Sequence, residues 1–114
     1  MSDCLFCRMV AGEITPDVIY ETETVLAFRD INPQAPTHVL VIPKKHIETL
    51  VDIVDEDTQL MGEIMQVATK VAKMEGLNES GYRTVFNCKQ DGGQEVYHIH
   101  LHLLGGRSMT WPPG

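Results

Sequence analysis

The sequence has little positive charge, few aromatic side chains and no long apolar run. Its 114 residues carry nine Lys and Arg against sixteen Asp and Glu, a net charge of −7. So acidic a chain is a poor partner for nucleic-acid backbones or anionic membrane surfaces, although a local pocket can still hold one mononucleotide. No apolar stretch resembles a membrane span, and the first residues lack the basic start and apolar stretch of a signal peptide. We therefore expect a cytoplasmic protein that binds neither nucleic acid nor membrane.

Cysteine is scarce as well, and the three present are an odd number. This speaks against a disulfide framework and for a reducing compartment. Repeats, low-complexity tracts and linkers are absent from the sequence, which predicts a single domain over residues 1–114. A chain of this length buries only about two-thirds of its extended surface, so a core shared in a homodimer would help to stabilise it.

Short apolar segments between turn residues predict a sheet. The expected strands are residues 18–21, 25–28, 39–42, 82–86 and 98–104, the last two forming a hairpin across the loop 89–94. One helix is expected to begin near Asp55 as its N-cap, to follow apolar residues at helical spacing, and to end at Gly76. Strands without regular helical crossovers predict an antiparallel sheet of the α+β class.

The most informative segment places His98, His100 and His102 on alternate positions, three of the chain's five histidines. In an extended segment these imidazoles share one face at intervals of roughly 7 Å, while Ile99, Leu101 and Leu103 point into a core. Such a row suits a three-histidine catalytic zinc site, or nucleophilic and acid–base chemistry on a phosphate. The preceding loop 91–94 contains two adjacent glycines that can bring backbone N–H groups against an anion, which favours phosphate chemistry.

The sequence resembles the histidine triad (HIT) superfamily and, within it, the HINT branch of histidine triad nucleotide-binding proteins. The resemblance covers essentially the whole chain, through the histidine row and the blocks at residues 28–38, 41–46, 91–94, 104–107 and 111–114. It implies a five-stranded antiparallel sheet with two helices, continued across a homodimer.

The resemblance also implies an activity, which is hydrolysis of the P–N bond of purine nucleoside 5′-phosphoramidates, chiefly of adenosine, through a nucleotidyl-histidine. No catalytic cofactor is then required. Two alternatives remain open: a nucleotide-binding regulatory protein with incidental hydrolysis, and a zinc-dependent hydrolase that uses the histidine row.

By resemblance, His100 is the nucleophile, His102 holds the phosphate and helps to protonate the leaving amine, and His38 is a fourth active-site histidine beside the row that His98 begins. Attack by imidazole on phosphorus forms a P–N bond, which matches in energy the bond that is broken.

The resemblance likewise assigns the nucleotide-binding residues. Asp30 is implied to accept hydrogen bonds from the ribose hydroxyls, although the residues alone support a turn at Asn32-Pro33 equally well. Glu95 stands where animal HINT proteins carry a Ser that touches the phosphate, and we expect its carboxylate to turn away from the anion. The other implied contacts are apolar walls of the purine pocket (Phe6, Ile14, Phe28, Ile31), phosphate-side groups (Asn87, Gly93) and the tail residue Trp111, expected near the partner's active site.

Cys4 and Cys7 form a Cys-x-x-Cys pair, which supplies half of a zinc site. By resemblance to some microbial HIT proteins, His46 and His98 complete a structural Cys₂His₂ site. A redox role is weaker because the pair does not lie between a strand and a helix of a thioredoxin-like unit. Two packed thiols without metal are the remaining interpretation.

Overall fold

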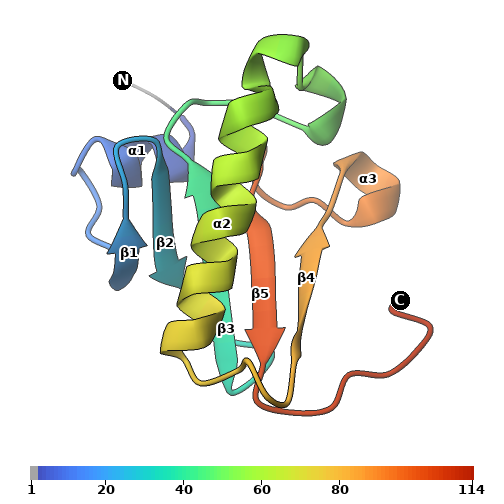
Figure 1. Ribbon diagram of the computed structural model, residues 1–114. Coiled ribbons are helices and arrows are strands. Elements are labelled where there is room, and N and C mark those ends of the chain that lie inside the picture. Colours follow the sequence, from blue (N-terminus) through green and yellow to red (C-terminus); the bar gives the residue numbers. More distant parts are fainter. Residues whose placement is uncertain (1–2) are drawn as a thin grey trace.

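The computed structural model describes residues 3–114, which form a five-stranded antiparallel sheet with the strand order β1-β2-β3-β5-β4 (Figure 1). This confirms the predicted fold class. The strands are β1 Val18–Glu21, β2 Val25–Arg29, β3 Thr37–Pro43, β4 Tyr82–Phe86 and β5 Leu101–Gly105.

The helix α2 (Thr58–Met74) crosses one face of the sheet, as Figure 1 shows, while the short helix α1 (Leu5–Val10) lies beside β2. The predicted start of α2 near Asp55 is wrong, because residues 55–57 form a separate 3₁₀ turn in which the Asp57 carboxylate accepts from the Val54 N–H. The predicted end is confirmed, since Gly76 follows the helix with φ +73°. A one-turn helix, α3 (Lys89–Gly92), replaces the predicted loop between the last two strands.

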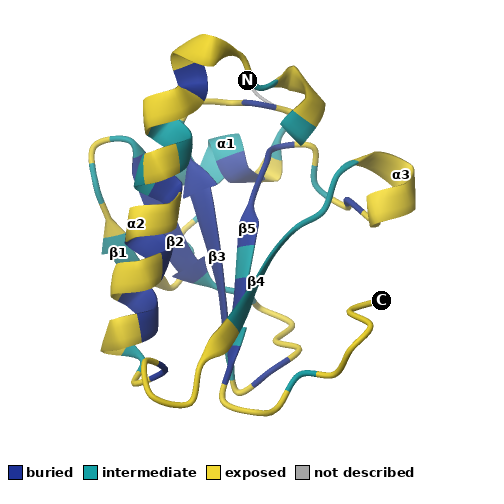
Figure 2. Ribbon diagram, turned by 45° about the vertical axis from the view of Figure 1, so that its right-hand side comes forward, coloured by how far each residue is buried: buried dark blue, intermediate teal, exposed yellow. Residues whose placement is uncertain are grey.

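The sheet separates an aliphatic core from a site face. Alternate residues of β3 and β5, such as Val39, Val41, Leu101 and Leu103, pack with α2 in the larger core. Figure 2 shows this as buried residues along the central strands and along the sheet-facing side of α2. The opposite face of β2 and β3 packs under α1 around Phe6, Phe28, Leu40 and neighbouring apolar residues.

The predicted histidine strand is shorter than expected, because β5 begins at Leu101 rather than at residue 98. Before it, the Ile99 N–H donates to the carbonyl of Ile47, which lies outside the sheet. The alternation of sides nevertheless continues, since Ile99 joins the core of Leu101 and Leu103. Among residues 3–114, no helix is long and apolar enough to cross a membrane.

Candidate active site

Strand register brings His38 and His102 together on the face opposite α2. In the β3–β5 pair, His38 lies opposite Leu104 and Leu40 lies opposite His102. His38 and His102 are therefore diagonal neighbours on one face, and their Nε2 and Nδ1 atoms are 2.9 Å apart. The active-site face is thus a consequence of antiparallel pairing between segments 64 residues apart in sequence.

The backbone fixes the tautomer of His100. Its Nδ1 lies 2.8 Å from the carbonyl oxygen of His98. A carbonyl only accepts, so Nδ1 carries the proton and Nε2 keeps its lone pair. The neutral His100 imidazole therefore presents an unprotonated nitrogen for nucleophilic attack.

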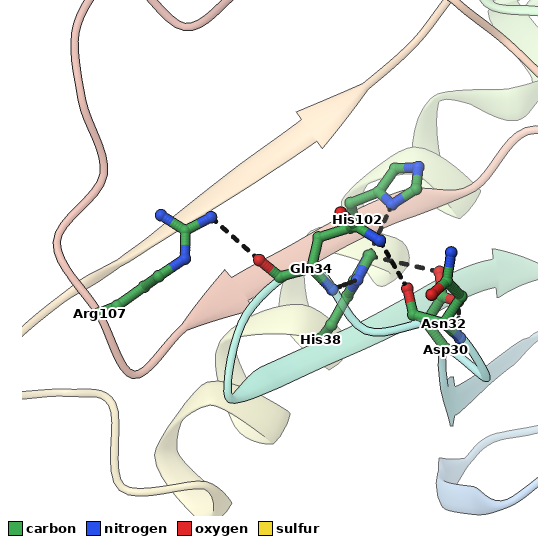
Figure 3. Close-up of polar contacts among 6 residues, drawn as sticks. All are labelled: Asp30, Asn32, Gln34, His38, His102 and Arg107. Carbon is green, nitrogen blue, oxygen red and sulfur yellow. Dashed lines mark hydrogen bonds and ion pairs between the residues drawn. The ribbon is translucent and has the colours of Figure 1, made fainter.

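A chain of hydrogen bonds also orients His38 and His102. The Gln34 N–H donates to His38 Nδ1 at 3.0 Å, which places the His38 proton on Nε2. That proton is donated to His102 Nδ1, so neutral His102 carries its own proton on Nε2. Figure 3 shows His38 between His102 and the Asp30–Asn32 turn, with the Asp30 carboxylate 3.5 Å from His38 Nε2. The pair is arranged to pass a proton from His38 toward His102.

The environment holds these imidazoles neutral. Burial lowers the pKa of His38, against the opposing charge of Asp30. Burial also lowers the pKa of His100, against the His98 carbonyl and the carboxylates of Asp30 and Glu95. For His102, burial and then the neighbouring His100 and His38 lower the pKa to about 4. The row therefore stays in the uncharged form that a nucleophile requires at neutral pH.

Two cavities meet at this row. A polar cavity of about 370 Å³ is lined by Asp30, Asn32, Gln34, His38, Asn87, Gly93, Glu95, His100 and His102. An adjoining, more apolar cavity of about 320 Å³ is lined mainly by Leu5, Phe6, Met9, Ile14, Phe28, Ile31, Leu40 and Val96. Asp30, Glu95, His100 and His102 line both cavities. A small anion attached to an apolar ring system matches this pair of cavities in size and polarity.

Most of the residues predicted for nucleotide binding lie along these cavities. Glu95 is exposed and lines both cavities, where its negative charge raises the pKa of His100 against the larger effect of burial. The Gly93 N–H already donates to the Gln90 carbonyl at 3.0 Å, so the glycine pair does not present this amide to an anion. Trp111 is 82% exposed and lines neither cavity of its own chain, so its expected place near the partner's active site stays a prediction.

The turn expected at Asp30 is confirmed, Asp30 also lines both cavities, and its contact with the ribose stays a prediction. One carboxylate oxygen accepts from the Asn32 N–H at 2.8 Å and forms the expected turn, while the other faces His38. Sequence reasoning missed Gln34 and Arg107 as orienting residues. Gln34 orients His38 through its N–H, and its carbonyl accepts from Arg107 at 3.0 Å (Figure 3). Backbone contacts of this kind leave no pattern in a sequence.

The four residues expected to bind a structural zinc ion, Cys4, Cys7, His46 and His98, lie together. Their four ligand atoms are all within 4.8 Å of one another. His98 Nδ1 lies 3.4 Å from Cys4 Sγ, 3.5 Å from Cys7 Sγ and 3.2 Å from His46 Nδ1. Nitrogen and sulfur ligands of one tetrahedral Zn²⁺ lie about 3.3–3.8 Å apart, so the set fits zinc. His98 Nε2 donates to the Pro43 carbonyl at 2.7 Å, which leaves Nδ1 deprotonated for a metal.

The same contacts separate His98 from the rest of the row. Its ring nitrogen points to the cysteines, whereas His100 and His102 face the polar cavity. The three imidazoles therefore do not converge on one metal, which argues against the three-histidine zinc site.

Fold and candidate site together describe an α+β protein with histidine side chains along two adjoining cavities, and its relatives place it among the hydrolases. The chain belongs to the HIT family, whose domain model matches residues 11–109. It is 49% identical to the purine nucleoside phosphoramidase of Escherichia coli K12 over 107 residues, covering 94% of this chain and 90% of that protein. It is 52% identical to a 14 kDa zinc-binding protein of Zea mays, covering 99% of this chain and 89% of that protein.

A solved structure supports the same family assignment. A HIT family hydrolase from Legionella pneumophila superposes with a TM-score of 0.96 at 62% identity, covering 98% of this chain and all of that chain.

The depressed pKa of His102 predicts acid sensitivity of folding. Unfolded His titrates near 6.5, whereas folded His102 titrates at about 4, so the unfolded chain binds more protons between these values. This contribution to stability is present above pH 6.5 and is lost as the pH falls toward 4. Urea unfolding at pH 7 and pH 5, with chelator throughout, should show a smaller acid loss in His102→Asn than in the parent. Equal losses in both proteins would contradict the assignment.

Proposed function

We propose that this protein hydrolyses the P–N bond of purine nucleoside 5′-phosphoramidates, with adenosine compounds preferred. The observation that carries the proposal is the orientation of His100, whose Nδ1–H is held by the His98 carbonyl while Nε2 stays available beside the polar cavity. The identity with a phosphoramidase over nearly the full chain supports this substrate class.

The proposed reaction has two displacements at phosphorus. His100 Nε2 attacks, a new P–N bond to the imidazole forms, and the bond to the leaving amine breaks. The amine takes the Nε2 proton of His102, which stays hydrogen-bonded to His38 across their 2.9 Å contact. Water then attacks the nucleotidyl-histidine and gives its proton back to His102, which releases the nucleoside monophosphate and restores His100.

The two cavities account for the substrate class. The polar cavity takes the phosphate and ribose, with Asp30 accepting the ribose hydroxyls. The apolar cavity takes the purine between Phe6 and Phe28 on one side and Ile14 and Ile31 at the rim.

A substrate panel tests the proposal. Adenylated amines, dinucleoside polyphosphates and nucleotide sugars would be compared by kcat/KM. We expect adenylated amines to be the best substrates. Preference for either other class would assign the chain to another branch of the family. Tight nucleotide binding without turnover would instead support the regulatory alternative.

We further propose a structural zinc ion at Cys4, Cys7, His46 and His98. The ligand distances and the deprotonated His98 Nδ1 support it, as does the similarity to a plant protein named for zinc binding. When bound, the metal supplies a crosslink between the N-terminal segment, the segment after β3 and the segment before β5.

Metal analysis of protein purified without chelator should find about one Zn²⁺ per chain. Because the four ligands come from three separate segments, removing the metal should lower the thermal midpoint by about 10 °C. A metal-free preparation of unchanged midpoint would contradict the site. Chelation should leave the chemistry at His100 largely intact, whereas complete loss of turnover would favour a zinc-dependent hydrolase.

We also propose a homodimer in which β4, an edge strand, continues the sheet into a second copy. The tail beyond β5 runs past β4 (Figure 1), where the Thr110 carbonyl accepts from Arg83 at 2.9 Å. Its exposed Trp111 is then positioned to reach the partner's leaving-group side.

Deleting residues 109–114 should therefore change the discrimination among leaving amines more than the affinity for AMP. The measurement compares kcat/KM across several adenylated amines for full-length and truncated protein, with AMP affinity as the control. Identical specificity profiles would show that the tail does not contribute to the site.

A further inference from the structure

His98 belongs to two sites at once. Its Nδ1 is a ligand atom of the cysteine–histidine set, while its backbone carbonyl holds the Nδ1–H of His100 at 2.8 Å. Its Nε2 is tied to the Pro43 carbonyl, so the ring has little freedom to turn. Any metal on Nδ1 therefore acts on a residue that also orients the nucleophile.

The helix α1 also links the metal ligands to the nucleotide cavities. It carries Cys7, with Cys4 at its N-cap, and between them Phe6, which is 3% exposed. The Phe6 ring meets His98 edge-on at a centroid distance of 5.8 Å, His100 at 5.1 Å and Phe28 at 5.6 Å. Leu5, Phe6 and Met9 form one wall of the apolar cavity. One short helix thus carries metal ligands on one side and a cavity wall on the other.

Few polar contacts between described residues hold this helix to the rest of the fold. Its six residues are too few for a helix to persist alone in water. Cys4 and Cys7 contact His46 and His98 across the fold. The other polar contacts described for this helix within residues 3–114 stay within residues 4–14. Thiol–imidazole contacts at 3.2–3.5 Å are weak by comparison with zinc–ligand bonds. The other restraint is apolar packing, of Phe6 within the smaller core and of Met9 and Val10 against it.

We propose that zinc at this site positions α1, and through Phe6 the base-binding wall, so that metal occupancy sets the affinity for the purine rather than for the phosphate. The inference rests on the proposed nucleotide activity and zinc site. Phe6 is a contact residue for the base, since it lines the apolar cavity. Without the metal, α1 loosens, and binding of a purine must first order its three wall side chains. The phosphate and ribose contacts of the polar cavity lie outside this helix and keep their geometry.

The test compares two ligands that differ only in the base. Affinities for AMP and ribose 5-phosphate would be measured by calorimetry on zinc-loaded and chelator-treated protein, with metal content determined on each sample. Zinc removal should weaken AMP binding by about tenfold or more and ribose 5-phosphate binding by less than about threefold.

Three variants sharpen the result. His46→Ala removes an exposed ligand that lines neither cavity, and should reproduce the zinc-free pattern even with zinc in the buffer. Cys88→Ser, a thiol outside the metal set, should behave as the parent. Phe6→Leu should keep its zinc and lose AMP affinity selectively.

Hydrogen exchange gives a readout independent of binding. Amides 8–12 of α1 and its C-terminal turn should exchange faster without zinc, while β3 and β5 remain protected and report that the sheet is folded.

The outcomes separate the hypotheses. Zinc uptake with unchanged AMP affinity on its removal, or equal weakening of both ligands, would overturn the inference while leaving the metal site in place. Phe6→Leu with normal AMP affinity would overturn the role of the wall. Failure to take up zinc would refute the metal site and the inference together. Failure of zinc-loaded parent to bind AMP would refute the proposed nucleotide activity.

Discussion

Replacing His100 by Ala should lower kcat for adenosine 5′-phosphoramidates by about 10³-fold or more, because it removes the nucleophile. No other imidazole can substitute from its present position. His98 Nδ1 points to the cysteines, and His102 Nδ1 is engaged by His38. The loss should appear in kcat rather than in affinity, since the polar cavity keeps its remaining contacts.

Two controls accompany this measurement. AMP binding by His100→Ala should stay within about threefold of the parent, because the imidazole acts on the reacting phosphorus rather than on the nucleoside. Mass spectrometry of rapidly quenched reactions should detect an adenylyl adduct on the parent and none on the variant. A variant with near-normal kcat would remove His100 from the nucleophile role.

Asp30→Asn should reduce kcat/KM for ribonucleoside substrates by about 10- to 100-fold, equivalent to about 1–3 kcal/mol for a hydrogen bond to a charged acceptor. The substitution keeps the shape of the side chain. An amide oxygen can still accept from the Asn32 N–H, so the turn at 2.8 Å can be retained. The substitution removes the negative charge that faces His38. In our proposal the same charge also accepts hydrogen bonds from the ribose hydroxyls.

Dideoxyribonucleoside substrates separate these two functions of Asp30. If the carboxylate binds the ribose, the parent should prefer the ribonucleoside strongly and Asp30→Asn should treat both substrates alike. If it acts only on His38, at 3.5 Å, both substrates should slow equally and the preference should persist. An unchanged thermal midpoint would confirm that the turn survives in the variant.

The alternation of residues 98–103 was sufficient to predict which side chains face the core and which face the site. Period-two patterning needs only that the chain be extended, which apolar side chains of one face enforce by burial. It did not predict where β5 begins, because that depends on partners. The Ile99 N–H bonds to Ile47 rather than to a strand, and nothing local to residues 98–100 indicates this.

The first residue of α2 could not be predicted from the sequence either. Asp55, Glu56 and Asp57 are the residue types expected in a first helical turn, yet they form a separate 3₁₀ turn. Acidic residues favour either arrangement, and the choice depends on local contacts such as the Val54 N–H to the Asp57 carboxylate.

By itself, then, the sequence determined the α+β sheet, the histidine row and the Cys-x-x-Cys pair, because patterning and residue chemistry act over a few neighbouring positions. Only the tertiary structure decided the protonation of each imidazole, since the deciding partners are backbone groups: the Gln34 N–H for His38, the Pro43 carbonyl for His98 and the His98 carbonyl for His100. It also decided that His98 leaves the catalytic row to meet Cys4, 94 residues away. A hydrogen bond or metal ligand set depends on distances of a few ångströms, and those distances exist only once the strands have paired.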